Sequence, residues 1–381
     1  MKTSTLHGLA IAGGTTLALL AAIVIGAKLA ARSLGIEDPA FRHENELAMW
    51  RDEPRIGYAN AKHFSGFSYG NIPVETNERG FRGTRPTPVE KPTGVRRIVG
   101  LGDSILWGTG VVEADSILGL LEAKLDADAP HEVWNGGVIG YSTLQEMRFL
   151  EWHVLPLKPD VVLVNYCMND TLPNEDPFDN ARPIALEYLN GLSAGGFEAS
   201  ARERQHIAEL AGIIANADHV WNTLRGLEQR KPGLTRTTRK VMVELPMARM
   251  ADVARSAGVR LVYLFIPPKF GREKYAQHVA DLTPILEARG AEWVDLQGAL
   301  AVGENEVAED EKWGEQRRSR AEWLQGVWPP ELVQLLWVRR LAAVHDEYLF
   351  FDYLHPTKRG NEIIADEVYR YLAATDPRSR G

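Results

Sequence analysis

The segment 160–166, with the sequence DVVLVNY, constrains the fold of this chain more than any other feature. Its centre is continuously apolar, which is typical of a strand buried on both faces of a parallel sheet. Shorter apolar runs precede and follow it, separated by segments with apolar residues at helical spacing. We therefore predict an α/β fold in which a parallel sheet is covered by helices on both faces.

This alternation extends over most of the chain. In parallel sheets of this kind, functional residues gather at the carboxyl ends of the strands, so motifs that directly follow a strand are the first candidates for a site. The expected strands cover residues 97–101, 133–135, 160–166, 260–266 and 292–296, and the expected helices cover residues 117–125, 142–153, 247–257, 274–289 and 358–372.

Two segments interrupt the alternation and are predicted to be mainly helical insertions. Residues 172–234 open with prolines and continue as charged sequence, and residues 299–347 hold four of the ten tryptophans. Because each insertion adjoins a predicted site motif, we expect both at the rim of the site, as a lid or a substrate platform. The competing interpretation is that the tryptophans pack in a small core of their own, since aromatic side chains usually bury area.

The remaining chain divides around a predicted domain over residues 97–372. Residues 33–96 are polar and rich in Pro and Gly, which predicts an arm of short strands and turns. Residues 373–381 form a tail.

Residues 6–27 carry no charge and are long enough to cross a hydrocarbon core of roughly 30 Å as a helix. We predict an N-terminal transmembrane helix that anchors the protein through residues 1–32. A cleaved signal peptide is the main alternative, and a buried core helix is the other. Lys2 precedes the run, and Lys28 and Arg32 follow it, so the flanking charges do not decide its orientation. We expect the following domain to be extracytoplasmic, in the periplasm.

Charge and cysteine content exclude several classes of protein. The net charge is −8 and no long basic stretch occurs, which disfavours a nucleic-acid partner. A single cysteine, Cys167, permits no intrachain disulfide and no cysteine-rich zinc site. We expect no metal and no cofactor, and we expect Cys167 to be a small buried residue.

A serine and a histidine could supply nucleophilic chemistry. Ser104, in Gly-Asp-Ser, directly follows the strand expected over 97–101. A serine hydroxyl needs a base, and His355 is the candidate, with Asp352 one turn earlier to orient its ring. The alternatives are that Ser104 is a helix N-cap and that Asp352 and His355 belong to a surface turn.

Two further residues could stabilise an oxyanion. Gly140 follows the second expected strand and can offer its backbone N–H, and Asn169 follows the third and can offer its side-chain amide. Both residue types are also common in ordinary turns.

Taken together, these motifs make the chain resemble the SGNH hydrolases, also called the GDSL esterase/lipase family, over residues 97–372. The resemblance implies a flavodoxin-like three-layer α/β/α sandwich. It also implies a nucleophile at Ser104, a base at His355 with Asp352 as its partner, and oxyanion donors from Gly140, Asn169 and the Ser104 backbone.

Some features lie outside or depart from the family pattern. Residues 76–83, TNERGFRG, resemble a segment that precedes the domain in some bacterial members. Cys167 replaces the usual glycine of the third motif, and Leu106 and Trp107 are bulky beside the nucleophile. These departures affect the expected substrate shape more than the expected catalysis.

We therefore expect a membrane-anchored serine esterase that works through an acyl-enzyme. An acylated glycan or lipid is the expected partner, and the O-acetyl groups of an envelope polysaccharide are the substrate that the resemblance suggests. An O-acyltransferase with the same site is the nearest alternative. A non-catalytic, membrane-tethered binding or assembly protein on a hydrolase fold is the alternative of another class.

Overall fold

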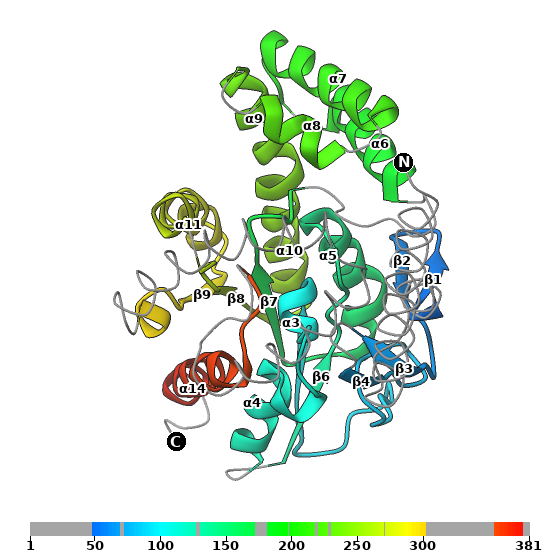
Figure 1. The fold of residues 1–381 in the computed structure, drawn as a ribbon, viewed down its shortest axis with the longest axis vertical. Helices are drawn as coiled ribbons and strands as arrows, with labels where there is room; N and C mark the ends of the chain where they lie inside the picture. The colour runs from blue at the N-terminus through cyan, green and yellow to red at the C-terminus, as the bar shows by residue number, and fades with distance from the viewer. Residues whose placement is uncertain are drawn as a thin grey trace, which may run out of the picture.

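The computed structural model describes residues 48–68, 72–126, 130–171, 181–196, 198–217, 220–227, 230–269, 271–301 and 354–375. Its centre is a parallel sheet of five strands in the order β6-β5-β7-β8-β9 (Figure 1). Numbered along the sheet's own chain order this is 2-1-3-4-5, the order of flavodoxin. The strands are β5 (Arg96–Leu101), β6 (His131–Asn135), β7 (Val161–Tyr166), β8 (Arg260–Phe265) and β9 (Glu292–Asp295).

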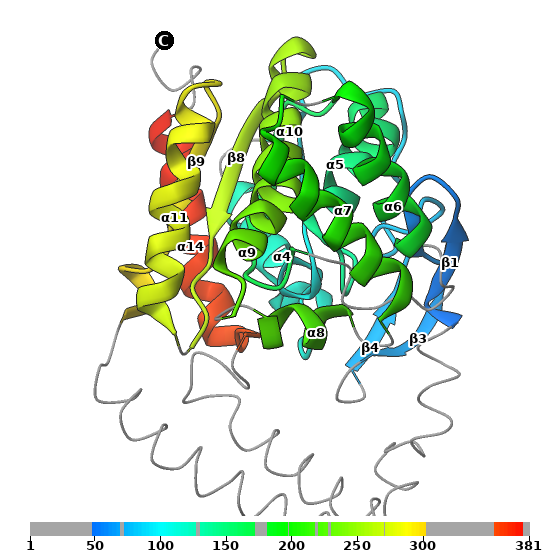
Figure 2. The same ribbon diagram turned by 90° about the horizontal axis from the view of Figure 1, so that it is seen from above.

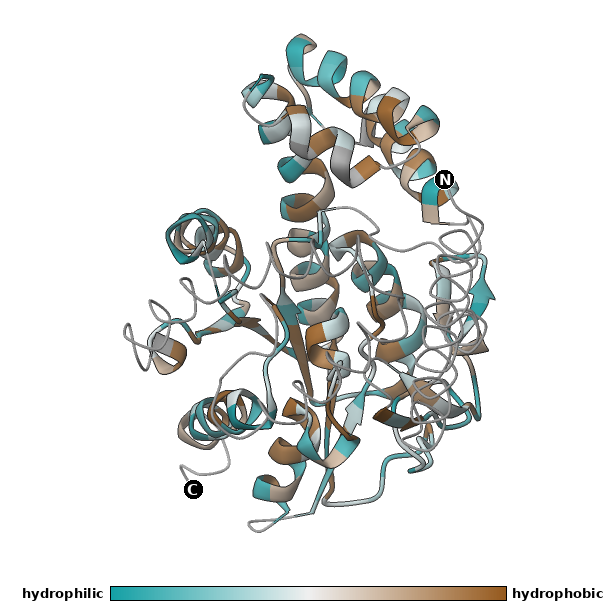
Figure 3. Cartoon of the chain, in the orientation of Figure 1, coloured by the Kyte–Doolittle hydropathy of each residue, from teal (hydrophilic) through white to brown (hydrophobic). Residues whose placement is uncertain are grey.

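The strands alternate their side chains between two apolar cores, which confirms that the sheet is covered on both faces. Val162 and Val164 of β7 belong to one core, and Val161 and Leu163 to the other. The first core is completed by α5 (Thr143–Phe149), α10 (Leu245–Ser256) and α11 (Arg272–Glu287), and the second by α4 (Ile117–Leu125) and α14 (Lys358–Thr375). In Figure 3 the central strands are brown, and α11 and α14 carry teal on part of their surface.

The predicted strands and helices of this framework are all present, with boundaries that shift by a few residues. The largest difference is in the helix expected over 142–153. There, α5 ends at Phe149 and continues as a π-helical turn, Leu150–Val154, and a 3₁₀ turn, Leu155–Leu157. Short 3₁₀ turns also cover Glu113–Asp115 and Ala299–Ala301.

The described part of the arm forms two antiparallel hairpins, drawn in blue in Figure 1. In the first, β1 (Trp50–Glu53) pairs with β2 (Gly57–Asn60), and in the second, β3 (Ser65–Ser68) pairs with β4 (Ile72–Glu75). After the second hairpin, Arg82 forms an antiparallel bridge with Asn135 at the end of the edge strand β6. The arm therefore contacts the carboxyl end of the edge strand β6.

The described part of the 172–234 insertion is helical, as predicted, and stands beside α10 and α5 (Figure 2). Its apolar residues join the same core as α5 and α10, so it enlarges that side of the sandwich. It contains α6 (Ala181–Gly191), a π-helical turn (Leu192–Gly196), α7 (Ala201–Asn216), α8 (Val220–Leu227) and α9 (Pro232–Arg239), and a second π-helical turn (Lys240–Glu244) leads into α10.

Several predictions fall outside the described residues: the anchor at 6–27, residue Asp352, residues 172–180, and the 299–347 insertion beyond Ala301. No helix among the residues that the structure describes combines the length and the apolar character needed to span a membrane.

Candidate active site

Ser104 and His355, which are 251 positions apart in the sequence, meet at the carboxyl end of the sheet. A hydrogen bond of 2.8 Å joins Ser104 Oγ and His355 Nε2. Ser104 is the first residue of α3 (Ser104–Trp107), directly after β5, and His355 lies on the segment that leads into α14. The surface-turn alternative for His355 is therefore wrong, because its ring contacts the predicted nucleophile.

The N-cap alternative for Ser104 is also wrong, because Asp103 caps α3. One Asp103 carboxylate oxygen accepts hydrogen bonds from the Ile105 backbone N–H (2.9 Å) and from Asn165 Nδ2 (3.0 Å). Ser104 Oγ lies 3.5 Å from the other Asp103 carboxylate oxygen and 2.8 Å from His355 Nε2, so its shorter contact is with the histidine.

The start of α14 is tied to the loop that follows α3. The Asn361 backbone N–H donates to the Thr357 carbonyl (2.8 Å), and Asn361 Nδ2 donates to the Asp115 carbonyl (3.0 Å). Lys358 also forms a 2.9 Å ion pair with Asp115. These contacts fix the start of α14, and with it the segment that carries His355, relative to the loop that follows Ser104.

The predicted oxyanion residues follow strands that are neighbours in the sheet. Gly140 lies in the loop after β6 with φ +81°, a backbone conformation that favours glycine. Among the described residues, the backbone N–H groups of Ser104 and Gly140 donate no hydrogen bond. Asn169 lies half-buried in the turn after β7, where the Asp170 N–H donates to the Cys167 carbonyl (3.1 Å). The backbone N–H groups of Ser104 and Gly140 are therefore two unengaged donors at the end of the sheet where the predicted nucleophile lies.

Three buried carboxyl groups lie behind Ser104, and sequence analysis did not predict them as a group. They belong to Asp103, Glu146 and Asp170, each 1% exposed or less. Burial, and then the carboxylate of Asp103, raise the pKa of Glu146 well above its ordinary value. Burial, then Glu146 and Asp103, do the same for the pKa of Asp170. Burial beside other carboxyl groups therefore favours the protonated forms of Glu146 and Asp170.

Single ligand atoms of Asp103, Cys167 and Asp170 lie within 4.8 Å of one another, so these residues are the candidate ligands for a metal ion. Burial raises the pKa of the Cys167 thiol well above its usual range, so a cation that binds here would have to displace a proton from the thiol. Cys167 is 2% exposed, in agreement with its predicted role as a small buried residue.

Three residues near the site were not predicted from the sequence as part of it. Asn165 looks like one more residue of a buried strand, yet its amide donates to the cap at Asp103. Glu146 stands among the apolar positions of the helix expected over 142–153, and a charged residue there was the available signal. A third, Arg82, lies within the TNERGFRG segment, which was noted only as a resemblance.

Comparison with known proteins gives a family match. The model of the GDSL-like lipase/acylhydrolase family matches residues 101–363, a range that includes Ser104, Gly140, Asn169 and His355. None of the curated proteins compared with the chain matches it.

Similar solved structures include TesA, with 14% identity and a TM-score of 0.37 over 73% of this chain and 99% of that one. The psychrotrophic esterase EstA from Pseudoalteromonas sp. has 14% identity and a TM-score of 0.39 over 73% and 97%. A variant of Axe2, an acetyl-xylooligosaccharide esterase from Geobacillus, has 18% identity and a TM-score of 0.37 over 73% and 94%.

Proposed function

Because the chain belongs to the GDSL-like lipase/acylhydrolase family and is a serine hydrolase that acts on ester bonds, we propose that Ser104 is its nucleophile and His355 its general base. The 2.8 Å hydrogen bond between Ser104 Oγ and His355 Nε2 is the observation that carries this proposal. It has the length that a base needs to take the proton of an attacking hydroxyl.

In the first half of the reaction, Ser104 Oγ forms a bond to the ester carbonyl carbon while its proton passes to His355 Nε2. The tetrahedral intermediate then breaks the bond to the alcohol oxygen, and the histidine returns the proton to that alcohol. In the second half, water loses a proton to His355, attacks the acyl-enzyme and releases the acid. The Ser104 hydroxyl regains the proton.

Charge on the carbonyl oxygen needs donors that are in place before the reaction. We propose the backbone N–H groups of Ser104 and Gly140 and the side-chain amide of Asn169. The unengaged state of the two backbone donors supports this role. We further propose that Asp352, which lies outside the described residues, orients His355 from its other ring nitrogen.

The finer proposal concerns substrate and place. We propose that residues 6–27 anchor the protein to a membrane with the catalytic domain on the periplasmic side, and that the substrate is an acylated glycan or lipid of the envelope. The support is the uncharged N-terminal run, long enough to span a bilayer. O-acetyl groups of an envelope polysaccharide are the specific substrate to test.

The nucleophile assignment can be tested on the full chain with a fluorophosphonate probe and peptide mass spectrometry. We expect the label on Ser104, and we expect Ser104→Ala to lower kcat by at least ~10³-fold. Ser116→Ala is the matched control. Ser116 Oγ accepts from the Gly119 N–H (3.1 Å) as the N-cap of α4, so its loss affects stability and leaves labelling intact. Folded protein that resists the probe, or that carries the label elsewhere, would contradict the assignment.

The acceptor can be tested in the same preparation. We expect acetylated glycans to release free acetate. Transfer of the acetyl group to an added glycan, with little free acetate, would instead identify an acyltransferase that uses the same serine. Ser104→Ala that leaves a cellular phenotype unchanged would point to a binding or assembly role.

A further inference from the structure

The helix that carries Ser104 is too short to be stable on its own. α3 has four residues, whereas isolated helices shorter than about 12 residues are marginal in water. The Ser104 and Ile105 carbonyls accept from the Gly108 N–H at 3.2 and 3.1 Å, whereas the Leu106 and Trp107 carbonyls need donors from elsewhere. Asn135 Nδ2 supplies one, reaching the Leu106 carbonyl at 3.0 Å and the Trp107 carbonyl at 3.2 Å.

Arg82, from the arm, supplies further hydrogen-bond donors to the end of α3 and to the loop after it. Its Nη1 donates to the Trp107 carbonyl and, at 2.8 Å, to the Gly108 carbonyl, while Nη2 donates to the Val111 carbonyl at 2.5 Å. The guanidinium also lies over the Trp107 ring, 5.1 Å from its centroid. One side chain thus holds the end of α3 and the loop that follows it.

The surroundings of Arg82 are built for this approach. Its backbone N–H donates to the Asn135 carbonyl (2.9 Å), which fixes the arm on the edge strand. Gly108 has φ +86°, and a Cβ there would lie 2.7 Å from Arg82 Nη1, so a larger residue would push the guanidinium away. The side chain is buried, with only 4% of the residue exposed.

A buried guanidinium is costly unless its donors are engaged. Burial lowers the pKa of Arg82 to about 10, although the Glu113 carboxylate opposes the shift, so the group is still a cation at neutral pH. Its charge faces carbonyl oxygens at a helix C-terminus, where a cation is favourable. Its planar fork reaches three carbonyls at once, which a lysine ammonium on a single stem does not reproduce.

We propose that Arg82 is a positioning residue for Ser104, acting through the last turn of α3, and that the arm is therefore part of the catalytic unit. This inference rests on the proposed role of Ser104. The other end of α3 is fixed by Asp103, so loosening the end that Arg82 holds tilts the helix and moves Ser104 Oγ relative to His355.

Arg82→Lys tests the inference, and Arg97→Lys is its matched control. Arg97 is also buried, and it donates to the carbonyls of Val89 (3.1 Å), Glu90 (3.3 Å) and Leu157. It also pairs with Glu132 (2.8 Å), and it lies at the amino end of β5, the opposite end from Ser104. Both substitutions keep the positive charge but replace the planar guanidinium by an ammonium group.

We expect Arg82→Lys to lower kcat and the rate of fluorophosphonate labelling by roughly 10- to 100-fold, since small misplacements of reacting groups are costly. KM should change by less than about twofold, because Arg82 does not contact the substrate. Arg97→Lys should leave kcat within about twofold while lowering the melting temperature at least as much.

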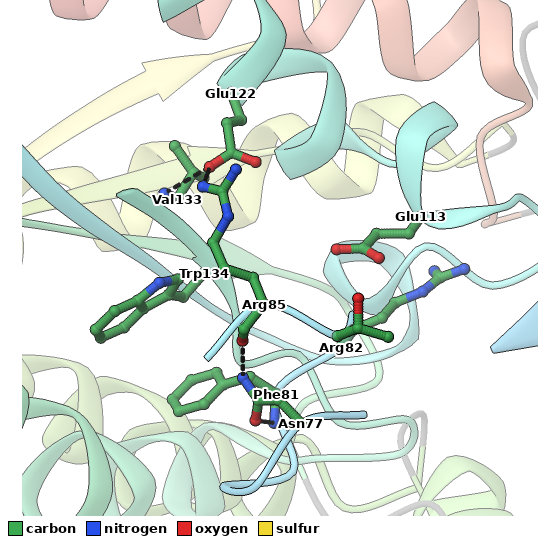
Figure 4. Close-up of a pocket in the computed structure, with 9 residues that line it drawn as sticks. Asn77, Phe81, Arg82, Arg85, Glu113, Glu122, Val133 and Trp134 are labelled. Carbon is green, nitrogen blue, oxygen red and sulfur yellow. Dashed lines mark hydrogen bonds and ion pairs between the residues drawn. The ribbon is translucent and has the colours of Figure 1, made fainter. Parts of the chain in front are cut away.

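Arg82→Ala adds a readout that a purely structural role would not move. Arg82 and Glu113 line a pocket of about 220 Å³ together with Val133 and Trp134 of β6 (Figure 4), and we expect a small cation to enter the space that the truncated side chain leaves beside this pocket. Methylguanidinium, well below concentrations that unfold the protein, should raise the kcat of Arg82→Ala and leave that of Arg97→Ala unchanged.

The inference is overturned if Arg82→Lys folds and labels at the wild-type rate, if Arg97→Lys lowers kcat as much, or if Arg82→Lys does not fold. In the last case stability alone explains the arginine. Failure of the proposed function looks different, because wild-type protein would then not carry the label on Ser104 at all.

Discussion

The arm and the α6–α9 insertion both extend the same α/β framework and both bury apolar side chains in one core, but they differ in their hydrogen bonds to the rest of the framework. The arm reaches the catalytic loops with directed hydrogen bonds: Tyr58 Oη donates to the Ile139 carbonyl (2.9 Å), and Asn60 Nδ2 donates to the Gly137 carbonyl (3.0 Å). The insertion attaches mainly by burial, with Ile207 and Leu210 of α7 inside the core that α5 and α10 share.

This difference predicts a division of labour. A hydrogen bond depends on distance and angle, so the arm fixes where backbone groups of the catalytic loops lie. Apolar burial is non-directional and scales with area, so the insertion contributes stability without setting the position of any single group. Loss of a hydrogen bond from the arm should therefore lower kcat at a small cost in stability. Truncation of a side chain in the insertion core should lower stability and leave kcat nearly unchanged.

Leu210→Ala should give the largest effect on stability. Leu210 is fully buried in α7, and truncation of a buried leucine removes about 2–5 kcal/mol from the free energy of unfolding. We expect the kcat of the folded protein to stay within about twofold, because no directed contact to a catalytic loop is lost. Urea unfolding and esterase assays on the same preparation measure both quantities.

Gln205→Ala, on the exposed side of the same helix, is the control and should change neither quantity. If Leu210→Ala instead lowered kcat tenfold in fully folded protein, the insertion would also position the site, and the contrast with the arm would be wrong.

Glu146→Gln tests the buried carboxyl groups. Glu146 lies on α5, the helix that contacts the arm through a hydrogen bond from Gln145 Nε2 to the Ile56 carbonyl (3.2 Å). The folded protein keeps a proton on Glu146 at pH values where the unfolded chain, with its ordinary pKa of 4.5, has lost it. Folding therefore takes up a proton, and stability falls as pH rises above that value, by about 1.4 kcal/mol for each unit by which the pKa is raised.

A glutamine does not titrate, so Glu146→Gln should flatten the decline in the free energy of unfolding between acidic and mildly alkaline pH. Glu151→Gln, which replaces the surface partner of Arg249, should keep the wild-type slope. Parallel curves for wild type and Glu146→Gln would show that Glu146 is ionised in the folded protein.

The framework could be predicted from the sequence because its signals are local. The apolar run of β7 and the helical spacing of α4, found at Ile117–Leu125 as expected, reflect contacts that repeat along one element. The meeting of Ser104 with His355 followed from family motifs at strand ends. The order of the motifs along the sheet carried information that neither residue carries alone.

The supports of the site could not be predicted in the same way. The contacts of Tyr58 with Ile139 and of Arg82 with Val111 each join a side chain to a backbone carbonyl, 81 and 29 positions away. Every residue has a carbonyl, so a bond of this kind leaves no mark at the accepting position. Only the folded chain shows which carbonyl accepts the bond, and the same holds for the raised pKa of Glu146, which is caused by burial and by the nearby Asp103 carboxylate.

Two tyrosines give the finest test of the contrast, with the smallest expected effect. Tyr58→Phe keeps the ring that packs edge-on against Tyr141 but removes the hydroxyl that donates to the Ile139 carbonyl, next to Gly140. We expect a loss of about 0.5–1.5 kcal/mol in stability for this hydrogen bond. Because the loop that presents the Gly140 N–H loosens, kcat should fall roughly three- to tenfold with KM unchanged.

Tyr188→Phe removes the same hydroxyl from α6 of the insertion and should shift stability by no more than ~0.5 kcal/mol and leave kcat unchanged. Each variant lacks one hydroxyl oxygen of the wild-type protein. A lower kcat in Tyr58→Phe than in Tyr188→Phe would therefore reflect the lost contact with the loop that contains Gly140, because the general cost of losing a hydroxyl is common to both. Equal kcat values would mean that the arm holds its loop by packing, as the insertion holds α10, and that the hydrogen bonds of the arm do not set the geometry of the proposed oxyanion donors.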